Sequence, residues 1–432
     1  MKSLFVTLAL ALALGFVASL APLAAQAPET EAARPTPSGY PVQPGVWRLP
    51  HGNDPALPLD DLEPLRQVIG NASVVGLGET IHTSGGYYRM KHRAFRFLVE
   101  RMGFRVFAFE SPWENAEKVA RYVATCGGEA GTAVTQGLFG VWASEEVRDL
   151  AEWMCDWNRT HRKPKDRLHF FGFDIQQPKL DGPALIAFLS RIGIPEDDPA
   201  ADGIRQCEGV ERDWYPQPIP EEAHTRCMDA LTWIESHFAR NAKAIVRQTS
   251  KADFEWAKVR LVGLRGWEFQ MWYPDSRSYT GRDEAMAYTF QVIRKLRHPR
   301  AKIAVWAHNS HVSHAPHPLN GGIPMGMFLT RALGRSYVNL GLAAREVAID
   351  WPNGLGCGPQ PLGPNASEEV FHGVGEGDLL VDLDVPGAEP LLAPGAVYTL
   401  GARRMVPRDH FDGVLYLEES PKMTPLRWEP CQ

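Results

Sequence analysis

The stretch VVGLGETIH at residues 74–82 decides the fold expected of this chain, because an apolar run leads directly into acidic and imidazole side chains. Three other stretches have the same form: VFAFE at 106–110, FFGFD at 170–174 and IAVWAH at 303–308. Continuous apolar runs of this length, separated by helical patterns, predict parallel strands that are covered on both faces. Ligands of open α/β sheets bind beyond the carboxyl ends of such strands. If the four strands run the same way, three carboxylates and several imidazoles meet at one edge of the sheet.

The chain as a whole predicts an α/β fold, in which helices flank a central, mostly parallel sheet and a helical subdomain is inserted. Residues 59–178 and 281–432 are assigned to the α/β core. Residues 179–280 are helical in pattern and rich in aromatic side chains, including Trp256 and Trp272. These side chains form either the core of the insertion, which we expect to cover the site, or a wall for a bulky apolar ligand.

The N-terminus has the pattern of a secretory signal peptide over residues 1–27, with Lys2, an apolar run and then small residues. Residues 28–58 are Pro-rich and predict an extended lead-in. No other stretch approaches the roughly 20 apolar residues that span a bilayer. We therefore expect an exported protein, secreted or periplasmic, that is free of the membrane after cleavage.

Composition limits the partners and permits disulfides. The formal net charge of −6 offers no basic surface for nucleic acid. The six cysteines are an even number, as expected for disulfides in an oxidising compartment. We favour pairing of Cys207 with Cys227, because both flank one Pro-rich loop.

His82 is the first candidate for chemistry. It lies in GETIHTSGG at 78–86, which follows a strand and opens a helix. Near a helix N-terminus the dipole favours the neutral, basic imidazole, and free backbone N–H groups can hold an oxyanion. The alternative is a surface turn with an incidental histidine. The acidic and imidazole groups expected at the other strand ends favour function.

The remaining candidates lie at the same strand ends or reach them. Glu110 ends an apolar strand, so its carboxylate must pair either with a structural arginine or with a histidine that it orients. His308 and His311 would share one face of a helical turn, where they can bind metal or act as general acid and electrostatic stabiliser. Three further residues are expected at this rim: Glu79, Lys91 and Asp174.

Several familiar catalytic motifs are missing from the sequence. It has no G-x-S-x-G elbow, so an ordinary serine esterase is not expected. It also has no H-E-x-x-H, no P-loop and no dinucleotide fingerprint. No cofactor is assigned, and that no metal is needed is implied only by the family resemblance given next.

These residues resemble the signature of the erythromycin esterase family. The matching stretches are GETIH at 78–82, KHR at 91–93, GF at 103–104, FAFE at 107–110, FGFD at 171–174, RD at 282–283, WAHNSH at 306–311, PMG at 324–326 and FDG at 411–413. The resemblance spans nearly the whole mature chain. It implies metal-independent hydrolysis of a macrolide lactone or another ester, as in antibiotic resistance, with His82 as the general base that activates water.

The resemblance also assigns roles to the neighbouring residues and exposes two departures. Glu79, Glu110, His308 and His311 match supporting positions, and Lys91 occupies a basic position. The family's usual Gly-Thr-x-Glu after the first histidine is TSGG at 83–86 here, so an acidic side chain is missing at the last of these positions. The signal peptide is the second departure, because the family's resistance enzymes are cytoplasmic.

Three functions are therefore compared. The first is a carboxylic ester hydrolase in which a histidine activates water, acting on a bulky, largely apolar small molecule. The second is a metal-dependent hydrolase that uses the same histidines and glutamates as ligands. The third is a protein that binds haem or another small molecule without turnover. We favour the first.

Overall fold

The structure is a computed structural model that describes residues 40–431 except 177, 208–219, 352–355, 363–365, 376, 386–395 and 399–402. Residues 37–432 form one compact unit. The expected signal peptide and residues 28–39 of the expected lead-in lie outside the described residues. The rest of the lead-in is folded rather than merely extended, because residues 40–43 and 46–48 form strands of the sheet and Trp47 is buried. No helix among those described is long and apolar enough to cross a membrane.

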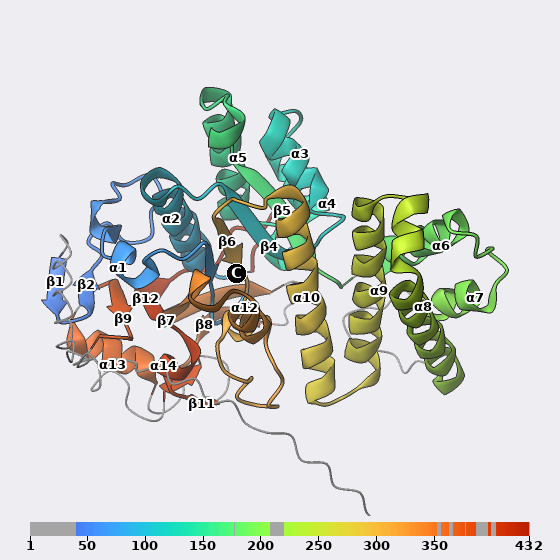
Figure 1. Cartoon of the computed structure of the whole chain (residues 1–432). Helices are drawn as coiled ribbons and strands as arrows, with labels where there is room; N and C mark the ends of the chain where they lie inside the picture. The colour runs from blue at the N-terminus through green and yellow to red at the C-terminus, as the bar shows by residue number, and fades with distance from the viewer. Residues whose placement is uncertain are drawn as a thin grey trace, which may run out of the picture. The chain divides into compact units, whose positions relative to one another are not determined.

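Most described strands join one ten-stranded sheet in the order β1-β2-β9-β12-β7-β3-β6-β4-β5, with β8 paired to β7 (Figure 1). The strands are β1 (Tyr40–Gln43), β2 (Val46–Arg48), β3 (Val74–Leu77), β4 (Val106–Pro112), β5 (His169–Asp174), β6 (Ile303–Trp306), β7 (Tyr337–Trp351), β8 (Gly356–Gln360), β9 (Leu379–Asp382) and β12 (Gly413–Ser420), besides a separate pair, β10 (Ala396–Tyr398) and β11 (Arg403–Met405). The strands from β12 to β5 are parallel, whereas β1, β2, β8 and β9 pair antiparallel. The predicted α/β class with a mostly parallel sheet is confirmed.

Fourteen α-helices are found in the described part of the chain. They are α1 (Leu65–Ile69), α2 (Gly85–Met102), α3 (Glu117–Thr125), α4 (Ala130–Gly137), α5 (Glu145–Thr160), α6 (Asp181–Arg191), α7 (Pro199–Cys207), α8 (Glu221–Gln248), α9 (Lys251–Trp272), α10 (Ser276–Arg297), α11 (Asn309–Val312), α12 (Met325–Leu333), α13 (Ser367–Val374) and α14 (Pro407–His410). They flank the sheet on both faces, as continuous apolar strands require.

The alternation of side chains along the strands creates two cores. On β4, Phe107 and Phe109 face the core shared with α2 and α5, while Val106 and Ala108 face the core shared with α10 and α12. Because successive side chains of a strand point to opposite faces, an all-apolar strand supplies both cores at once. The sheet is therefore rigid where its strands end.

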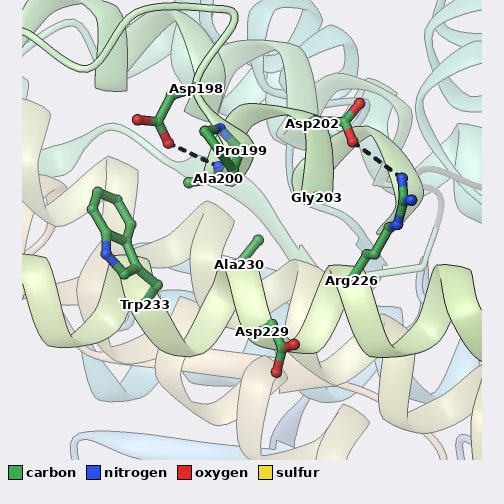
Figure 2. Close-up of a pocket in the computed structure, with 9 residues that line it drawn as sticks. All are labelled: Asp198, Pro199, Ala200, Asp202, Gly203, Arg226, Asp229, Ala230 and Trp233. Carbon is green, nitrogen blue, oxygen red and sulfur yellow. Dashed lines mark hydrogen bonds and ion pairs between the residues drawn. The ribbon is translucent and has the colours of Figure 1, made fainter.

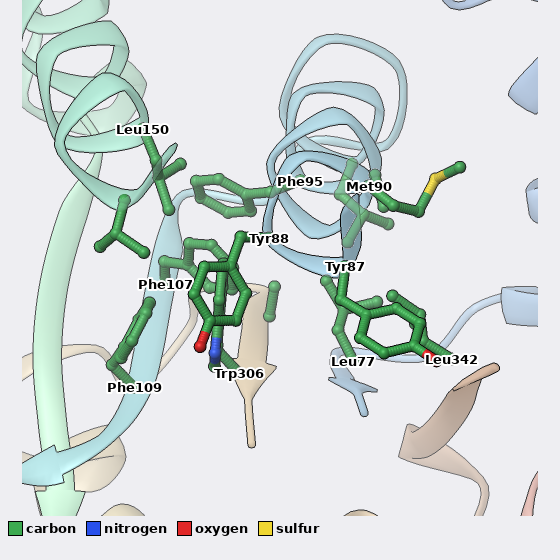
Figure 3. Close-up of a cluster of buried hydrophobic side chains, with 14 of the residues drawn as sticks. Leu77, Tyr87, Tyr88, Met90, Phe95, Phe107, Phe109, Leu150, Trp306 and Leu342 are labelled. Atoms are coloured by element: carbon green, nitrogen blue, oxygen red, sulfur yellow. The ribbon is translucent and has the colours of Figure 1, made fainter. Parts of the chain in front are cut away.

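The first core lies directly behind the strand ends that carry the candidate residues (Figure 3). Trp306 of β6 stacks on Phe109 of β4 with ring centroids 4.5 Å apart and packs against Tyr88 of α2 at 5.2 Å. Phe95, which is two turns further along the same face of α2, stacks on Phe107, with ring centroids 4.1 Å apart. This packing orders the start of α2 against the sheet.

In the described part of residues 179–280, helices α6 to α9 share a third core made of their own side chains, and α10 begins at Ser276, before the predicted boundary. They gather on the side of α10 away from the sheet (Figure 1). Helix α9 packs closely on α10, since a Cβ at Gly266 would lie 2.7 Å from the Cβ of Ala285. The helical content expected here is found, whereas its treatment as a separate domain remains a prediction.

All six cysteines form disulfides. The favoured pair, Cys207–Cys227, links α7 to α8 and is confirmed. The other two pairs are Cys126–Cys155 and Cys357–Cys431. The last of these links β8 to the segment that follows β12.

Candidate active site

The candidate residues follow the carboxyl ends of four adjacent parallel strands. Glu79 follows β3, Glu110 lies near the end of β4, Asp174 ends β5 and His308 follows β6. Neighbouring parallel strands end at one edge of the sheet, so these side chains meet there. The structure therefore brings together residues that are up to about 230 positions apart, such as His308, whose Nε2 lies 2.8 Å from the carbonyl oxygen of Thr80.

His82 has one occupied and one open nitrogen. Its Nδ1 is 2.8 Å from Oε1 of Glu79, and its side chain is 22% exposed. No hydrogen bond to Nε2 is found in the described part of the chain. Since the carboxylate accepts, Nδ1 carries a proton, and in the neutral ring the lone pair lies on Nε2. The His82 ring makes edge-to-face contacts with the rings of Trp142 and His308, whose centroids lie 4.5 Å and 5.2 Å from its own.

Glu79 is completely buried and shared between two donors. Its second oxygen accepts from Nζ of Lys91 at 2.6 Å, and Lys91 also donates to the carbonyl of Ala307 at 3.0 Å. The ammonium lies 4.4 Å from the ring of Trp306, a cation–π contact. Burial lowers the pKa of Lys91 more than Glu79 raises it, to about 8. The lysine therefore remains mostly charged at neutral pH.

His308 is satisfied at both nitrogens. Its Nε2–H is directed at the carbonyl of Thr80, and its Nδ1 accepts from the backbone N–H of Ser310 at 3.1 Å. Burial holds the pKa of His308 well below its usual value, and a proton on the nearby His82 or His311 ring lowers it further. His308 is therefore neutral. The next residue, Asn309, fixes it to the sheet by bonding both backbone groups of Leu342 on β7.

Glu110 and Asp174 share one guanidinium. Arg282 of α10 donates to Oε1 of Glu110 at 3.0 Å and also binds Asp174. The other oxygen of Glu110 accepts from the backbone N–H of His308 at 2.8 Å. Burial would raise the pKa of Glu110, but the charges of His311 and Arg282 outweigh it and hold that pKa far below its usual value.

His311 completes this side of the site. Its Nδ1 lies 2.8 Å from Oδ1 of Asp283, and its Nε2 lies 3.0 Å from Nη1 of Arg282 and 3.4 Å from Glu110. Burial lowers its pKa, but the carboxylates of Asp283 and Glu110 outweigh burial, and the pKa of His311 is raised. When neutral, Nε2 accepts from Arg282; when protonated, it donates to Glu110. The ring of Tyr279 stacks on His311 at 5.3 Å.

A family model described as erythromycin esterase matches residues 99–420, well over half of the chain. The chain belongs to the erythromycin esterase family.

Its relatives are distant. The chain is 25% identical over 329 residues to erythromycin esterase type II of Escherichia coli, which covers 69% of this chain and 74% of that protein. It is 23% identical over 399 residues to YbfO of Bacillus subtilis, covering 83% and 86% of the two chains. Membership of the erythromycin esterase family makes this protein a hydrolase by descent.

Two solved structures share the fold. A Bacillus cereus protein has a TM-score of 0.71 at 22% identity, covering 88% of this chain and 96% of that one. A mutant of the erythromycin esterase EreC, in its open conformation, has a TM-score of 0.68 at 16% identity, covering 87% and 98%.

The departure from the erythromycin esterase pattern after His82 has a steric basis. A Cβ at Gly86 would lie 2.5 Å from Oγ and 2.6 Å from Cα of Ser420 on β12. The start of α2 is pressed against β12 here, so an acidic side chain at this position has no room. Thr83, the first residue of the altered stretch, has a φ of +66°, a conformation that suits glycine.

Sequence reasoning did not name Trp142, and it quoted Arg282 and Asp283 only as part of the family signature, without a role in the site. A signal for Asp283 exists, because it shares a helical face with Met286, Ala287 and Phe290, all of them buried. A carboxylate on such a face requires a partner.

Two predicted supporting residues make their ring contacts elsewhere. Trp256 stacks on Trp113 at 4.9 Å, and Trp272 stacks on His224 at 4.0 Å. These contacts are not with the histidines of the site. The rings closest to His82 are instead those of Trp142 and His308, whereas Tyr279, from the predicted insertion, stacks on His311.

A separate cavity of about 590 Å³ lies between α7 and α8 (Figure 2). Ala200 and Ala230 line it, with Asp198, Asp229 and Trp233 at its rim. None of its lining residues belongs to the His82 cluster. Its size therefore says nothing about the reaction at the strand ends.

The histidines and carboxylates of the site are not arranged as a metal site. Among the residues that the structure describes, no group of three or more His, Cys, Asp or Glu side chains could hold a metal ion. In particular, a metal at His308 would have to displace Thr80 or Ser310 from the imidazole. The donor set as it stands does not fit a resident metal.

Proposed function

We propose that this protein is a carboxylic ester hydrolase that cleaves an ester or lactone of a bulky, largely apolar small molecule, with water activated by His82. The single observation that carries the proposal is the hydrogen bonding of the two nitrogens of the His82 ring. Nδ1 is bonded to the buried Glu79 at 2.8 Å, while no hydrogen bond to Nε2 is found among the described residues, and the side chain is partly exposed. An imidazole oriented by a carboxylate, with its second nitrogen open to accept a proton, is the arrangement that general-base catalysis requires.

The reaction begins as a water molecule beside His82 gives its proton to Nε2 and its oxygen attacks the carbonyl carbon of the ester. Glu79 accepts from Nδ1 and stabilises the imidazolium that forms. The tetrahedral intermediate then collapses, its C–O bond to the alcohol breaks, and the alkoxide takes up one proton, either from the His82 imidazolium or from His311, in which case the proton on His82 returns to His311 through solvent. The products are a carboxylic acid and an alcohol, or a hydroxy acid from a lactone. Positioned base catalysis of this kind supplies about 10²- to 10⁴-fold of the rate.

The other end of the site supplies positive charge. We assign to His311, whose pKa is raised, the protonation of the leaving group or the polarisation of the carbonyl. Arg282 stands beside it and is bound to Glu110. His308, neutral and fixed, is assigned to holding the loop between the two ends.

The location and the substrate class are part of the proposal. The signal pattern at residues 1–27 and the three disulfides support action outside the cytoplasm. Two relatives are named erythromycin esterases, so macrolides are the first lactones to test.

A substrate panel tests the proposal. Purified mature protein is assayed against aryl esters, alkyl esters, simple lactones and macrolides, with and without a chelator. We expect ester or lactone cleavage that survives chelation and is lost in His82→Ala. His237→Ala, a partly exposed histidine on α8, is the matched control and should retain full activity.

Three outcomes would overturn the proposal in different ways. Activity that is lost on chelation and restored by a divalent ion would favour the metal-dependent hydrolase. A Soret band on mixing with haem, with no ester cleaved, would favour a binding protein. Full activity in His82→Ala would remove the general base from the mechanism.

A further inference from the structure

The residue after His82 adopts an unusual backbone conformation. Thr83 has a φ of +66°, and Cys126 is the only other non-glycine residue with positive φ among those described. A β-branched side chain is especially unfavourable there, because its Cβ substituents crowd the backbone. Such a conformation persists only where the surroundings hold it.

The backbone N–H, the carbonyl and the hydroxyl of Thr83 each make a hydrogen bond within the protein. Its backbone N–H donates to Oη of Tyr88 at 2.7 Å, and its carbonyl accepts from the N–H of Met423 at 3.0 Å. Its hydroxyl Oγ1 accepts from the N–H of Asp350 at 3.2 Å. These partners belong to α2, to the segment after β12 and to β7, so three separate parts of the chain fix one residue.

The partners are themselves anchored. Tyr88 is fully buried and donates its hydroxyl proton to the carbonyl of Val141 at 2.7 Å. Asp350, also fully buried, accepts from Nε1 of Trp428 and from the N–H of Cys431, each at 2.8 Å. The anchors of Thr83 therefore cannot move without disturbing buried contacts.

The left-handed turn lies between His82 and the start of α2. A relaxation of φ at Thr83 toward ordinary values would rotate the chain on one side of the turn, and with it the His82 imidazole relative to Glu79. That pair forms a single hydrogen bond of 2.8 Å, and a side chain with one bond depends on its backbone for direction.

We propose that Thr83 is a positioning residue, whose hydroxyl bond to β7 holds the strained turn that aims His82 at Glu79. This inference rests on the proposed role of His82 as general base. The hydroxyl is the part that only the side chain supplies, because the other two contacts are made by the backbone.

Side-chain variants separate the hydroxyl from the strain. Thr83→Val keeps the branched shape and loses the hydrogen bond, Thr83→Ser keeps the hydroxyl, and Thr83→Gly relieves φ but lacks the hydroxyl. We expect kcat to fall about ten- to a hundredfold in Thr83→Val with KM unchanged, a loss typical of small misplacements of a catalytic group. Thr83→Ser should restore wild-type kcat. Thr83→Gly should keep kcat near the wild-type value, because glycine adopts the positive φ without strain and needs no hydroxyl to hold it.

An activity-independent measurement completes the test. In protein with ¹⁵N-labelled histidine, the Nδ1–H of His82 should give a downfield proton signal, identified by its loss in His82→Ala. We expect this signal to shift or to broaden by solvent exchange in Thr83→Val and to stay in place in Thr83→Ser.

The outcomes are distinguishable. Wild-type kcat in Thr83→Val, a loss of kcat in Thr83→Gly as large as that in Thr83→Val, or an unshifted signal in Thr83→Val would overturn the positioning role. If the wild-type protein cleaves no ester, the proposed function fails, yet the proton signal still decides whether Thr83 positions His82.

Discussion

The site has two ends, one with His82 and Glu79 and the other with His308, His311 and Glu110. They differ in how many imidazole nitrogens have a hydrogen-bond partner in the protein. At the first end His82 makes one hydrogen bond, to Glu79, and keeps Nε2 open. At the second end both nitrogens of His308 and of His311 have protein partners. Each end contains a buried ion pair, between Lys91 and Glu79 at the first end and between Arg282 and Glu110 at the second. Charge pairing is therefore common to both ends, and only the open nitrogen distinguishes them.

This difference separates reactivity from stability. A saturated network in a low dielectric environment is rigid, and removing one member leaves buried partners unpaired. A histidine with a free lone pair at the surface can be removed with little structural cost, because water replaces what it loses. We therefore expect substitutions at the first end to reduce activity, and those at the second end to reduce the free energy of unfolding.

The largest effect is expected for His82→Ala. It should lower kcat/KM by about 10²- to 10⁴-fold, the usual contribution of a general base. The melting temperature, measured by calorimetry, should stay nearly unchanged, because the side chain is partly exposed and makes one hydrogen bond. A large drop in melting temperature would instead make His82 a structural residue.

Arg282→Met should have its main effect on stability. It leaves Glu110 and Asp174 buried without their shared cation, and breaking a buried pair costs about 3–5 kcal/mol. Urea unfolding measures the change. The matched control is Arg66→Met, which breaks a pair with Glu63 at the surface and should cost less than about 1 kcal/mol. Equal costs for the two variants would contradict the contrast between buried and exposed pairs.

Glu79→Gln should lower kcat/KM by about ten- to a hundredfold. The amide lacks the charge that stabilises the His82 imidazolium, and a hydrogen bond to a charged group is worth about 1.5–3 kcal/mol. Steady-state kinetics at saturating and limiting substrate measure the loss. Glu152→Gln, at an exposed position of α5, is the control and should behave as wild type. A normal rate in Glu79→Gln would show that orientation of His82 does not need the carboxylate.

Acid stability should depend on His308. Because its pKa is well below the ordinary value of about 6.5, the native state keeps it neutral while the unfolded chain takes up a proton below that pH. Stability is therefore lost as pH falls below about 6.5, by up to about 1.4 kcal/mol per pH unit. Urea unfolding between pH 7 and 5 should give a smaller slope in His308→Asn. An unchanged slope would assign the effect to other buried histidines.

His311 should behave in the opposite direction. Its raised pKa means that the native state binds the proton more tightly than the unfolded chain. That stabilisation is complete below pH 6.5 and is lost as pH rises through the raised native pKa. His311→Gln should therefore flatten the alkaline side of the stability profile and leave the acid side unchanged.

The smallest effect is expected for Trp272→Phe. Its ring stacks on His224, so KM and kcat should both remain at wild-type values. Trp142→Phe, which changes a ring 4.5 Å from His82, should alter kcat. A rise in KM for Trp272→Phe would support the sequence-based prediction that this residue binds substrate.

The sequence predicted the sheet well because the signal is local. Each run such as VFAFE at 106–110 is apolar on both faces and ends in a charged residue, so strand, burial and parallel direction follow from one short pattern. The meeting of Glu79, Glu110 and His308 then follows from topology. Cys207–Cys227 could be predicted for a similar reason, since the two residues are 20 positions apart.

The parts that could not be predicted depend on contacts between distant segments. Arg282 joins Glu110 across 172 positions, and no local pattern records that contact. His308 has no open nitrogen, because Thr80 and Ser310 lie within hydrogen-bonding distance of its ring, whereas His82 keeps one. Differences of this kind depend on placements within a few ångströms. The ring contacts of Trp272 depend on how α8 packs on α9, a choice that an aromatic-rich composition leaves open.

The segment after β12 has a consequence for how this protein is divided into pieces. The family match ends at residue 420, yet the backbone N–H groups of Gly85 and Gly86 bond to the carbonyl of Pro421, and Met423 bonds to Thr83. A fragment cut at the end of the match would keep every histidine and carboxylate discussed above while losing the strip of chain against which their loop is folded. Expression boundaries taken from both ends of the family match, residues 99–420, would remove Glu79, His82 and Lys91 as well as this segment.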